Sequence, residues 1–234
     1  VVSNDAEVGE LLVSRVRAFG DYTCAEADGQ LYCWGENGGG QTGTGLEPVV
    51  TVPSQVPLRG KLIDWALGGP GGCAIVEEPV NAVPVRRLYC WGTAENGEFA
   101  DPTSSGAPTP ILIEAAPKNP DAVSLGWRTV CVLKAGLPYC WGGNYLGEAG
   151  TRPSLAANHR PASATLLDAL PGLSEVSMPR GMWGTACGRS DTAAWCWGPG
   201  KDKSLGYPDA VTRAVPVEVQ GLRMAGQTVQ ISQV

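Results

Sequence analysis

The sequence has little charge and almost no histidine. Only 17% of its 234 residues are charged, and His159 is the single imidazole. A Ser-His-Asp triad needs an imidazole beside an activated nucleophile. His159 lies in the proline-bounded segment LAANHRPA, which has no recognisable nucleophile motif. The sequence therefore predicts no catalytic residue.

Basic clusters and long apolar runs are also missing. The formal net charge is −6, and lysine and arginine are scattered, so the chain should repel a phosphate backbone. No uninterrupted apolar stretch approaches the roughly 18 residues of a membrane-spanning helix, and no charged-then-apolar signal sequence is present. We expect neither a nucleic-acid partner nor a membrane span.

Long helices are disfavoured by the abundance of glycine and proline. The chain contains 32 glycines and 19 prolines. In a helix interior each glycine costs about 1 kcal/mol and each proline about 3 kcal/mol relative to alanine. Turn-rich β structure is the expected alternative, and the predicted fold class is all-β.

Eight cysteines form a repeating pattern of four pairs. The second cysteine of each pair is followed by Trp-Gly, and these second cysteines are spaced 57, 50 and 56 residues apart. Such a period indicates stacked supersecondary units. The pairs are Cys24 with Cys33, Cys73 with Cys90, Cys131 with Cys140, and Cys187 with Cys196.

Strand geometry predicts a disulfide within each pair. A two-residue turn at Asp28 and Gly29 places Cys24 opposite Cys33 on a hairpin. This rung is of the non-hydrogen-bonded type, in which Cα atoms approach to about 4.5 Å, within reach of a disulfide. The third and fourth pairs have the same spacing, whereas the second pair encloses a longer loop with the same frame at its ends.

Four disulfides imply an oxidising compartment, so we expect an extracellular, cell-surface or periplasmic location. Zinc is the rival use of paired thiols, but the sequence has no Cys-x-x-Cys motif and only one histidine. We therefore expect no metal and no cofactor. With all cysteines paired, no thiol remains as a nucleophile.

Each repeat has a short lead-in strand, two hairpin arms and a trailing strand, which is the content of one β-propeller blade. The prediction is a single β-propeller domain or arc over residues 1–234, with four blades of four antiparallel strands. Residues 1–13 are expected to be a lead-in or the tail of a preceding blade, and residues 227–234 the start of a fifth unit. The repeats span about 14–60, 61–119, 120–172 and 173–226.

The frame from Val16 to Gly45, V-x-x-x-x-G followed by C-A-x-x-x-G-x-L-Y-C-W-G-x-N-x-x-G-Q-x-G-x-G, resembles the regulator of chromosome condensation repeat family. The resemblance implies a propeller that usually closes with seven blades, and a bacterial origin, because bacterial members often carry the cysteine pair. Four hairpins are fewer than seven. The chain is therefore expected to be an excerpt of a longer propeller or part of a shared ring.

Aromatic residues fall into two groups. One group recurs directly after the second cysteine and is expected to pack between neighbouring blades: Trp34, Trp91, Trp141 and Trp197. The other group lies near strand entries or in long loops, where aromatic side chains can anchor a protein partner. These candidate contacts are Trp127, Trp183, Tyr145, Tyr207 and Phe99.

Three functions are compatible with this pattern. The first is a non-enzymatic, extracytoplasmic module that binds another protein or further copies of itself, as a subunit of a cell-surface or secreted assembly. The second is a secreted inhibitor or regulator of an enzyme, which the resemblance implies because the family includes a nucleotide exchange factor and a secreted β-lactamase inhibitor. The third is a carbohydrate-active enzyme using loop carboxylates such as Glu98 and Asp101, although nothing in the sequence positions them.

Overall fold

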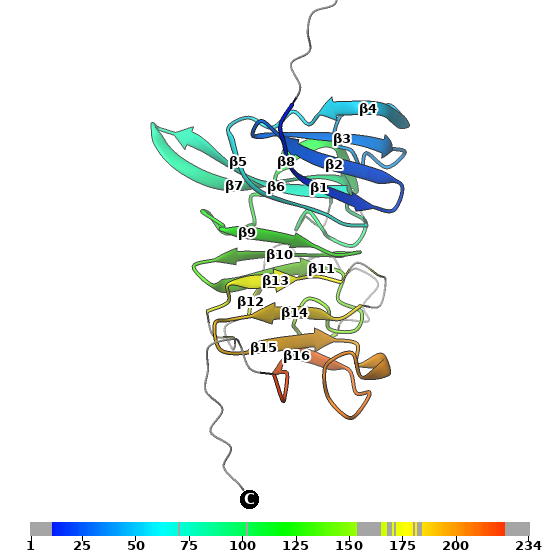
Figure 1. Ribbon diagram of the computed structural model, residues 1–234, viewed down its shortest axis with the longest axis vertical. Helices are drawn as coiled ribbons and strands as arrows, with labels where there is room; N and C mark the ends of the chain where they lie inside the picture. Colours follow the sequence, from blue (N-terminus) through cyan, green and yellow to red (C-terminus); the bar gives the residue numbers. More distant parts are fainter. Residues whose placement is uncertain are drawn as a thin grey trace, which may run out of the picture.

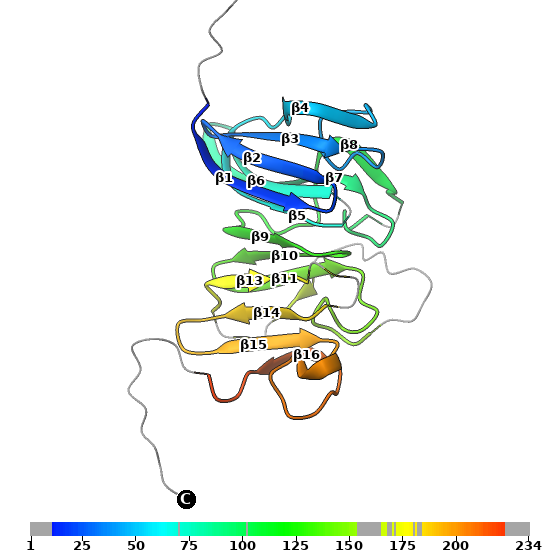
Figure 2. The same cartoon turned by 45° about the vertical axis from the view of Figure 1, so that its right-hand side comes forward.

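Four four-stranded antiparallel sheets make up the chain, as the sequence predicts. In each sheet every strand lies beside the next one in the sequence. The sheets are here called blades 1 to 4; in Figures 1 and 2, blades 1 and 2 overlap in the upper half of the picture, and blades 3 and 4 lie in the lower half. The computed structural model describes residues 11–69, 71–101, 103–153, 165–167, 170, 172–179, 181 and 184–222.

β1 begins at Val13, the last residue of the segment 1–13 predicted to be a lead-in or the tail of a preceding blade, and the other strands lie within the predicted repeats. Residues 1–10 of that segment, and residues 227–234, lie outside the described residues. Blade 1 consists of β1 (Val13–Phe19), β2 (Tyr22–Ala27), β3 (Gln30–Glu36) and β4 (Val49–Gln55). Blade 2 consists of β5 (Lys61–Leu67), β6 (Gly71–Val80), β7 (Val83–Thr93) and β8 (Gly106–Leu112). Blade 3 consists of β9 (Ala122–Leu125), β10 (Thr129–Lys134), β11 (Leu137–Gly142) and β12 (Thr165–Leu166). Blade 4 consists of β13 (Glu175–Ser177), β14 (Ala186–Arg189), β15 (Ala194–Gly198) and β16 (Arg213–Glu218), with a 3-10 turn at Lys201–Lys203.

The predicted disulfides are confirmed. In each central hairpin the two cysteines lie directly opposite one another, at a Cα–Cα distance of 4.1 Å. All eight cysteines are bridged, so no free thiol remains. The bonds join Cys24 to Cys33, Cys73 to Cys90, Cys131 to Cys140, and Cys187 to Cys196.

The second hairpin differs from the expected longer loop. Its ladder continues without interruption from the cysteines to the pair Val80 and Val83. Asn81 and Ala82 close it with φ angles of 52° and 65°, the left-handed conformation that a two-residue hairpin turn requires. This hairpin therefore projects beyond the others, as β6 and β7 show in Figure 1.

A buried tryptophan lies at each of the three contacts between neighbouring blades. Trp91, Trp141 and Trp197 are at most 1% exposed, which confirms their predicted place between blades. Each indole N–H donates a hydrogen bond to a loop carbonyl of the preceding blade. The acceptors are the carbonyl oxygens of Gln41, Glu98 and Glu148, at 3.0, 2.8 and 2.8 Å respectively.

For the fourth tryptophan, Trp34, the predicted burial between blades is wrong, because its side chain is only half-buried. The other three tryptophans are covered by the blade that precedes them. Blade 1 is the first blade among the described residues, so its equivalent face has no described blade against it. The frame position alone therefore does not bury the ring; a preceding blade is also needed.

Each disulfide lies on the opposite face of its blade, toward the blade that follows. Cys24 and Cys33 share an apolar cluster with Trp65 and Trp91 of blade 2. Similarly, the blade 2 bridge packs in the cluster that contains Trp141, and the blade 3 bridge in the cluster that contains Trp197. The two ends of the row of blades therefore differ: blade 1 presents the face that carries its tryptophan, and blade 4 presents the face that carries its disulfide.

Candidate functional site

The turns that join the first and second strands of the blades are hydrogen-bonded to one another at one rim. Gly69 N–H donates to the Gly126 carbonyl at 3.1 Å, and Trp127 N–H donates to the Pro179 carbonyl at 2.9 Å. Blades 2, 3 and 4 meet closely here. A Cβ atom on Gly68 would lie 2.2 Å from the Gly126 oxygen, so only glycine permits this approach.

Aromatic and guanidinium side chains gather at this rim. The Trp127 ring lies 6.0 Å from the Phe19 ring, with a tilt of 39° between the two planes. Arg128, the next residue, places its guanidinium 5.5 Å from the centre of the Tyr145 ring. All four side chains are half-buried. We call Phe19, Trp127, Arg128 and Tyr145 the rim cluster.

Two of the five predicted contact residues, Trp127 and Tyr145, are thus brought together. They also line one small pocket, together with Arg128 and Pro179. Sequence reasoning missed Phe19 and Arg128. The only local signal was their position, directly before the Gly20 turn and directly after Trp127. The Phe19–Trp127 contact joins blades 1 and 3, and the Arg128–Tyr145 contact joins two separate loops of blade 3.

Phe99 was wrongly predicted as a surface contact. It is 4% exposed and belongs to the apolar core that includes Trp141 and Val130. Its loop carries the carbonyl that binds the Trp141 indole, and this places the Phe99 ring between blades 2 and 3. Phe99 therefore contributes to packing and not to the surface.

The two remaining predicted contacts do not join the rim cluster. Tyr207 lies in the blade 4 loop and is half-buried. Its hydroxyl donates to the Glu218 carbonyl at 2.6 Å, and the Arg213 guanidinium lies 4.1 Å from the centre of its ring. Trp183 lies outside the described residues, as does His159.

The carboxylates considered for catalysis are bonded within their own loop. Glu98 is 2% exposed and accepts hydrogen bonds from the backbone N–H and side-chain amide of Asn96, at 2.8 and 2.9 Å. Burial raises the pKa of Glu98 above its usual range. Exposed Asp101 accepts from the N–H and hydroxyl of Thr103, which lower its pKa. Both groups are used to stabilise the loop.

The buried carboxyl predicts a specific pH dependence. Its pKa is raised in the folded chain, so the unfolded chain loses this proton first, and Glu98 makes the free energy of unfolding fall as pH rises above about 4.5. Glu98→Gln is expected to flatten that decline, measured by urea unfolding across the acidic range. The control Asp101→Asn should change the slope in the opposite direction, because the Asp101 pKa is lowered. An unchanged slope in Glu98→Gln would contradict the prediction.

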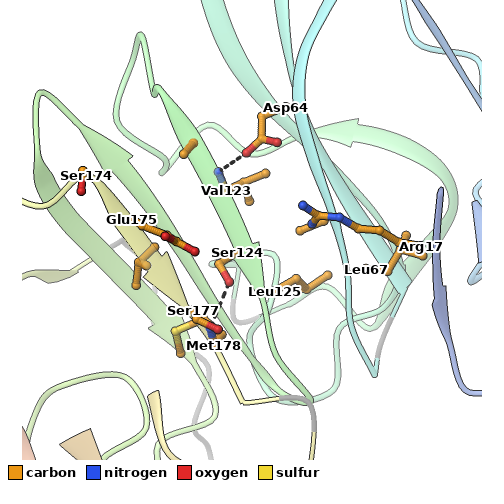
Figure 3. Close-up of a pocket in the computed structure, with 13 residues that line it drawn as sticks. Arg17, Asp64, Leu67, Val123, Ser124, Leu125, Ser174, Glu175, Ser177 and Met178 are labelled. Carbon is orange, nitrogen blue, oxygen red and sulfur yellow. Dashed lines mark hydrogen bonds between the residues drawn. The ribbon is translucent and has the colours of Figure 1, made fainter. Parts of the chain in front are cut away.

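A polar groove of about 330 Å³ runs along the first strands of the blades. Figure 3 shows two of its hydrogen bonds. Asp64 of β5 accepts the Val123 N–H at 2.9 Å, and Ser124 of β9 accepts the Met178 N–H at 3.0 Å. A side chain of one first strand thus satisfies the edge of the next, and the groove's polar groups serve to attach successive blades.

Sites of other kinds are not found within the described ranges. No three histidine, cysteine, aspartate or glutamate residues there come together in a way that could hold a metal ion. In the same part of the chain, no helix has the length and apolar character needed to cross a membrane.

Known proteins share this sequence pattern and this architecture. Residues 28–75 match the model of the Regulator of chromosome condensation (RCC1) repeat. The chain is 27% identical over 208 residues to E3 ubiquitin-protein ligase HERC2 of Homo sapiens, covering 86% of this chain and 4% of HERC2. It is 28% identical over 210 residues to the Ultraviolet-B receptor UVR8 of Arabidopsis thaliana, covering 87% of this chain and 45% of the receptor.

A solved structure shows the same fold. Yeast RCC1 (Prp20), determined bound to Kap60, superimposes with a TM-score of 0.74 at 17% identity, covering 91% of this chain and 49% of that one. The chain spans about half the length of yeast RCC1, 45% of the length of UVR8 and 4% of the length of HERC2. Residues 28–75 are therefore similar to an RCC1 repeat, and the four blades have the fold of an RCC1-like β-propeller.

Proposed function

We propose that this chain is a non-enzymatic protein-binding module and that the rim cluster is its contact surface. The observation that carries the proposal is the half-buried Trp127 ring, which lies 6.0 Å from the Phe19 ring and lines a small pocket with Arg128 and Tyr145. Tryptophan, tyrosine and arginine are the residue types that dominate binding energy at protein interfaces. Because backbone hydrogen bonds between turns already fix Trp127, little conformational entropy is lost on binding.

Two further findings support the proposal. Yeast RCC1 (Prp20) is solved in a complex with another protein, Kap60. The four disulfides favour an oxidising compartment, so we place the module outside the cell, on its surface or in the periplasm, as a subunit of a secreted or surface assembly. The bacterial origin that the resemblance implies stays a prediction.

The test compares the oxidised chain with the double variant Trp127→Ala/Tyr145→Ala as immobilised bait. Secreted and envelope fractions of the source organism are passed over both, and the retained proteins are identified and titrated. A specific partner is expected on the unchanged chain, with at least a tenfold weaker affinity for the double variant, since a hot-spot residue contributes more than about 1.4 kcal/mol.

Val83→Ser provides a matched control. Val83 is an exposed apolar side chain at the tip of the projecting hairpin, away from the rim cluster, and its replacement should leave the affinity unchanged. Thermal unfolding of each variant shows that the fold is kept. Failure of the unchanged chain to retain a partner, or equal retention by the double variant, would overturn the proposal.

A further inference from the structure

The projecting hairpin of blade 2 ends in an exposed apolar surface. We call residues 79–84, with the sequence PVNAVP, the hairpin tip. Val83 is 59% exposed, Val80 is half-buried, and the other four residues are exposed. The packing neighbours of blade 2 are blades 1 and 3. In blade 2 the ladder has seven rungs beyond the cysteine pair, whereas in blades 1 and 3 it has three. The exposure of the tip therefore comes from the length of its own hairpin (Figure 1).

Contacts at the base hold this hairpin in one position. The Cys73–Cys90 disulfide joins its two strands. Further out, Asn119 N–H donates to the Arg86 carbonyl, and Arg86 N–H donates to the Asn119 side-chain oxygen, both at 3.0 Å. The Arg86 guanidinium also donates to the Asp121 carboxylate, just before blade 3, at 3.0 Å. A surface that is fixed before it meets a partner loses less conformational entropy on binding.

The charges next to the hairpin tip are paired within the hairpin. Glu77 forms an ion pair with Arg86 at 3.4 Å, and Glu78 forms one with Arg87 at 3.3 Å. The tip itself contains no charged residue. A charged surface that packed against the tip would lose hydration without gaining an opposite charge, which is unfavourable. The tip therefore fits a partner surface that is also uncharged.

Two prolines prevent the tip from binding by strand addition. Along a hairpin, every second pair of opposed residues directs its backbone groups outward. Arg86 belongs to such a pair, because its carbonyl accepts the Asn119 N–H from outside the hairpin. The next outward pair is Pro79 and Pro84. Proline has no N–H, so both edges lack the donor that an added strand needs. The tip therefore has to bind through its side chains.

A lipid surface and a second copy of the chain are both poor occupants. Segments that enter a membrane interface carry tryptophan, tyrosine, lysine or arginine. The hairpin tip contains none of these, and the chain has a net charge of −6. Three pockets of this chain, which contain Asp64, Arg128 and Lys118 respectively, are lined in part by charged side chains. The remaining occupant is a pocket on a different protein.

We propose that the hairpin tip inserts into an uncharged, apolar pocket of a different protein. Val80 and Val83 lie directly opposite one another, so both side chains are on one face of the hairpin and enter the pocket together. The inference goes beyond the proposed function, because it assigns a second contact surface. The rim cluster lies at the turns between first and second strands, whereas the tip lies at the other end of the second strand.

Site-specific photocrosslinking tests the proposal. The oxidised chain is prepared with p-benzoylphenylalanine in place of Val83 and, as a matched control, in place of Val52, which is 63% exposed on β4. Each chain is illuminated with secreted and envelope fractions of the source organism, and the adducts are identified by mass spectrometry. An adduct with a different protein is expected at position 83 and not at position 52. An adduct only with a second copy, with another part of the same chain or with lipid, or no adduct, would overturn the proposal.

Titration of the purified cross-linked protein then establishes which groups make the contact. Val80→Ser/Val83→Ser should bind it at least tenfold more weakly than the unchanged chain, and Val83→Ser alone should give a smaller loss if the double variant does not fold. Thermal unfolding shows that each variant keeps the fold.

Two further variants separate this contact from the alternatives. Trp127→Ala/Tyr145→Ala should bind the cross-linked protein as the unchanged chain does, so a failure of this proposal is distinguishable from a failure at the rim cluster. Pro79→Ala/Pro84→Ala restores both outward N–H groups and should bind no more tightly. Tighter binding by the proline variant, equal binding by the valine variant, or a loss in the rim-cluster variant would each overturn the proposal.

Discussion

Replacing Trp141 by alanine is expected to lower the free energy of unfolding by about 3–5 kcal/mol. The indole is buried between blades 2 and 3, packs in a core with Phe99 and Val130, and donates to the Glu98 carbonyl at 2.8 Å. Its removal leaves a cavity and an unpaired carbonyl at the same place. Urea unfolding followed by tryptophan fluorescence and circular dichroism measures the loss.

Trp34→Ala is the matched control, because Trp34 occupies the same frame position without a described preceding blade. We expect a loss of about 1 kcal/mol or less, as for other partly exposed side chains. The two variants together separate the effect of the residue from the effect of the neighbouring blade. Equal losses would contradict the blade arrangement described above.

Full reduction of the disulfides is expected to remove an amount of stability comparable to the total. In the chain-entropy model a bridge closing a ten-residue loop contributes about 2.7 kcal/mol, whereas a domain has about 5–15 kcal/mol in all. Three of the four bridges close loops of this size, with a sequence separation of nine, and the fourth closes a larger one. Thermal unfolding of the oxidised chain and of a reduced, alkylated sample measures the difference.

Partial reduction should begin at one bridge. Without denaturant, Cys187–Cys196 is expected to react with a mild reductant first, since Cys187 is half-buried and the other three bridges are covered by a following blade. Alkylation followed by peptide mapping gives the order. Earlier reaction of Cys131–Cys140 would contradict the expected order of reduction. An unchanged melting temperature after full reduction would contradict the expected contribution of the disulfides to stability.

The hairpins were predictable because their determinants are local. A two-residue turn such as Asp28-Gly29 fixes which residues face each other, and Cys24 and Cys33 follow from it by counting. The Trp-Gly after each second cysteine marks the repeat, and the Gly- and Pro-rich intervals mark the loops. Strand content, blade number and disulfide pairing are all consequences of this short-range pattern.

The surface was less predictable because burial depends on the neighbouring blade. Phe99 and Trp34 both follow the rules for their local segments, yet Phe99 is covered by blade 3 and Trp34 has no described blade against it. Similarly, Phe19 joins the rim cluster only because the fold brings the end of β1 in blade 1 beside Trp127 of blade 3. The projecting hairpin was missed for a different reason: Asn81-Ala82 lacks the glycine that usually indicates a tight turn.

The tryptophan-to-carbonyl hydrogen bond is the same at all three internal contacts, and this bears on how such a chain can change in length. Each blade donates its indole N–H to the preceding blade and offers a loop carbonyl to the following blade. The stability of the row of blades is then approximately a sum over neighbouring pairs. A whole unit copied between any two others would meet compatible partners on both sides. Gain or loss of complete units is therefore far less disruptive than a deletion within one of them.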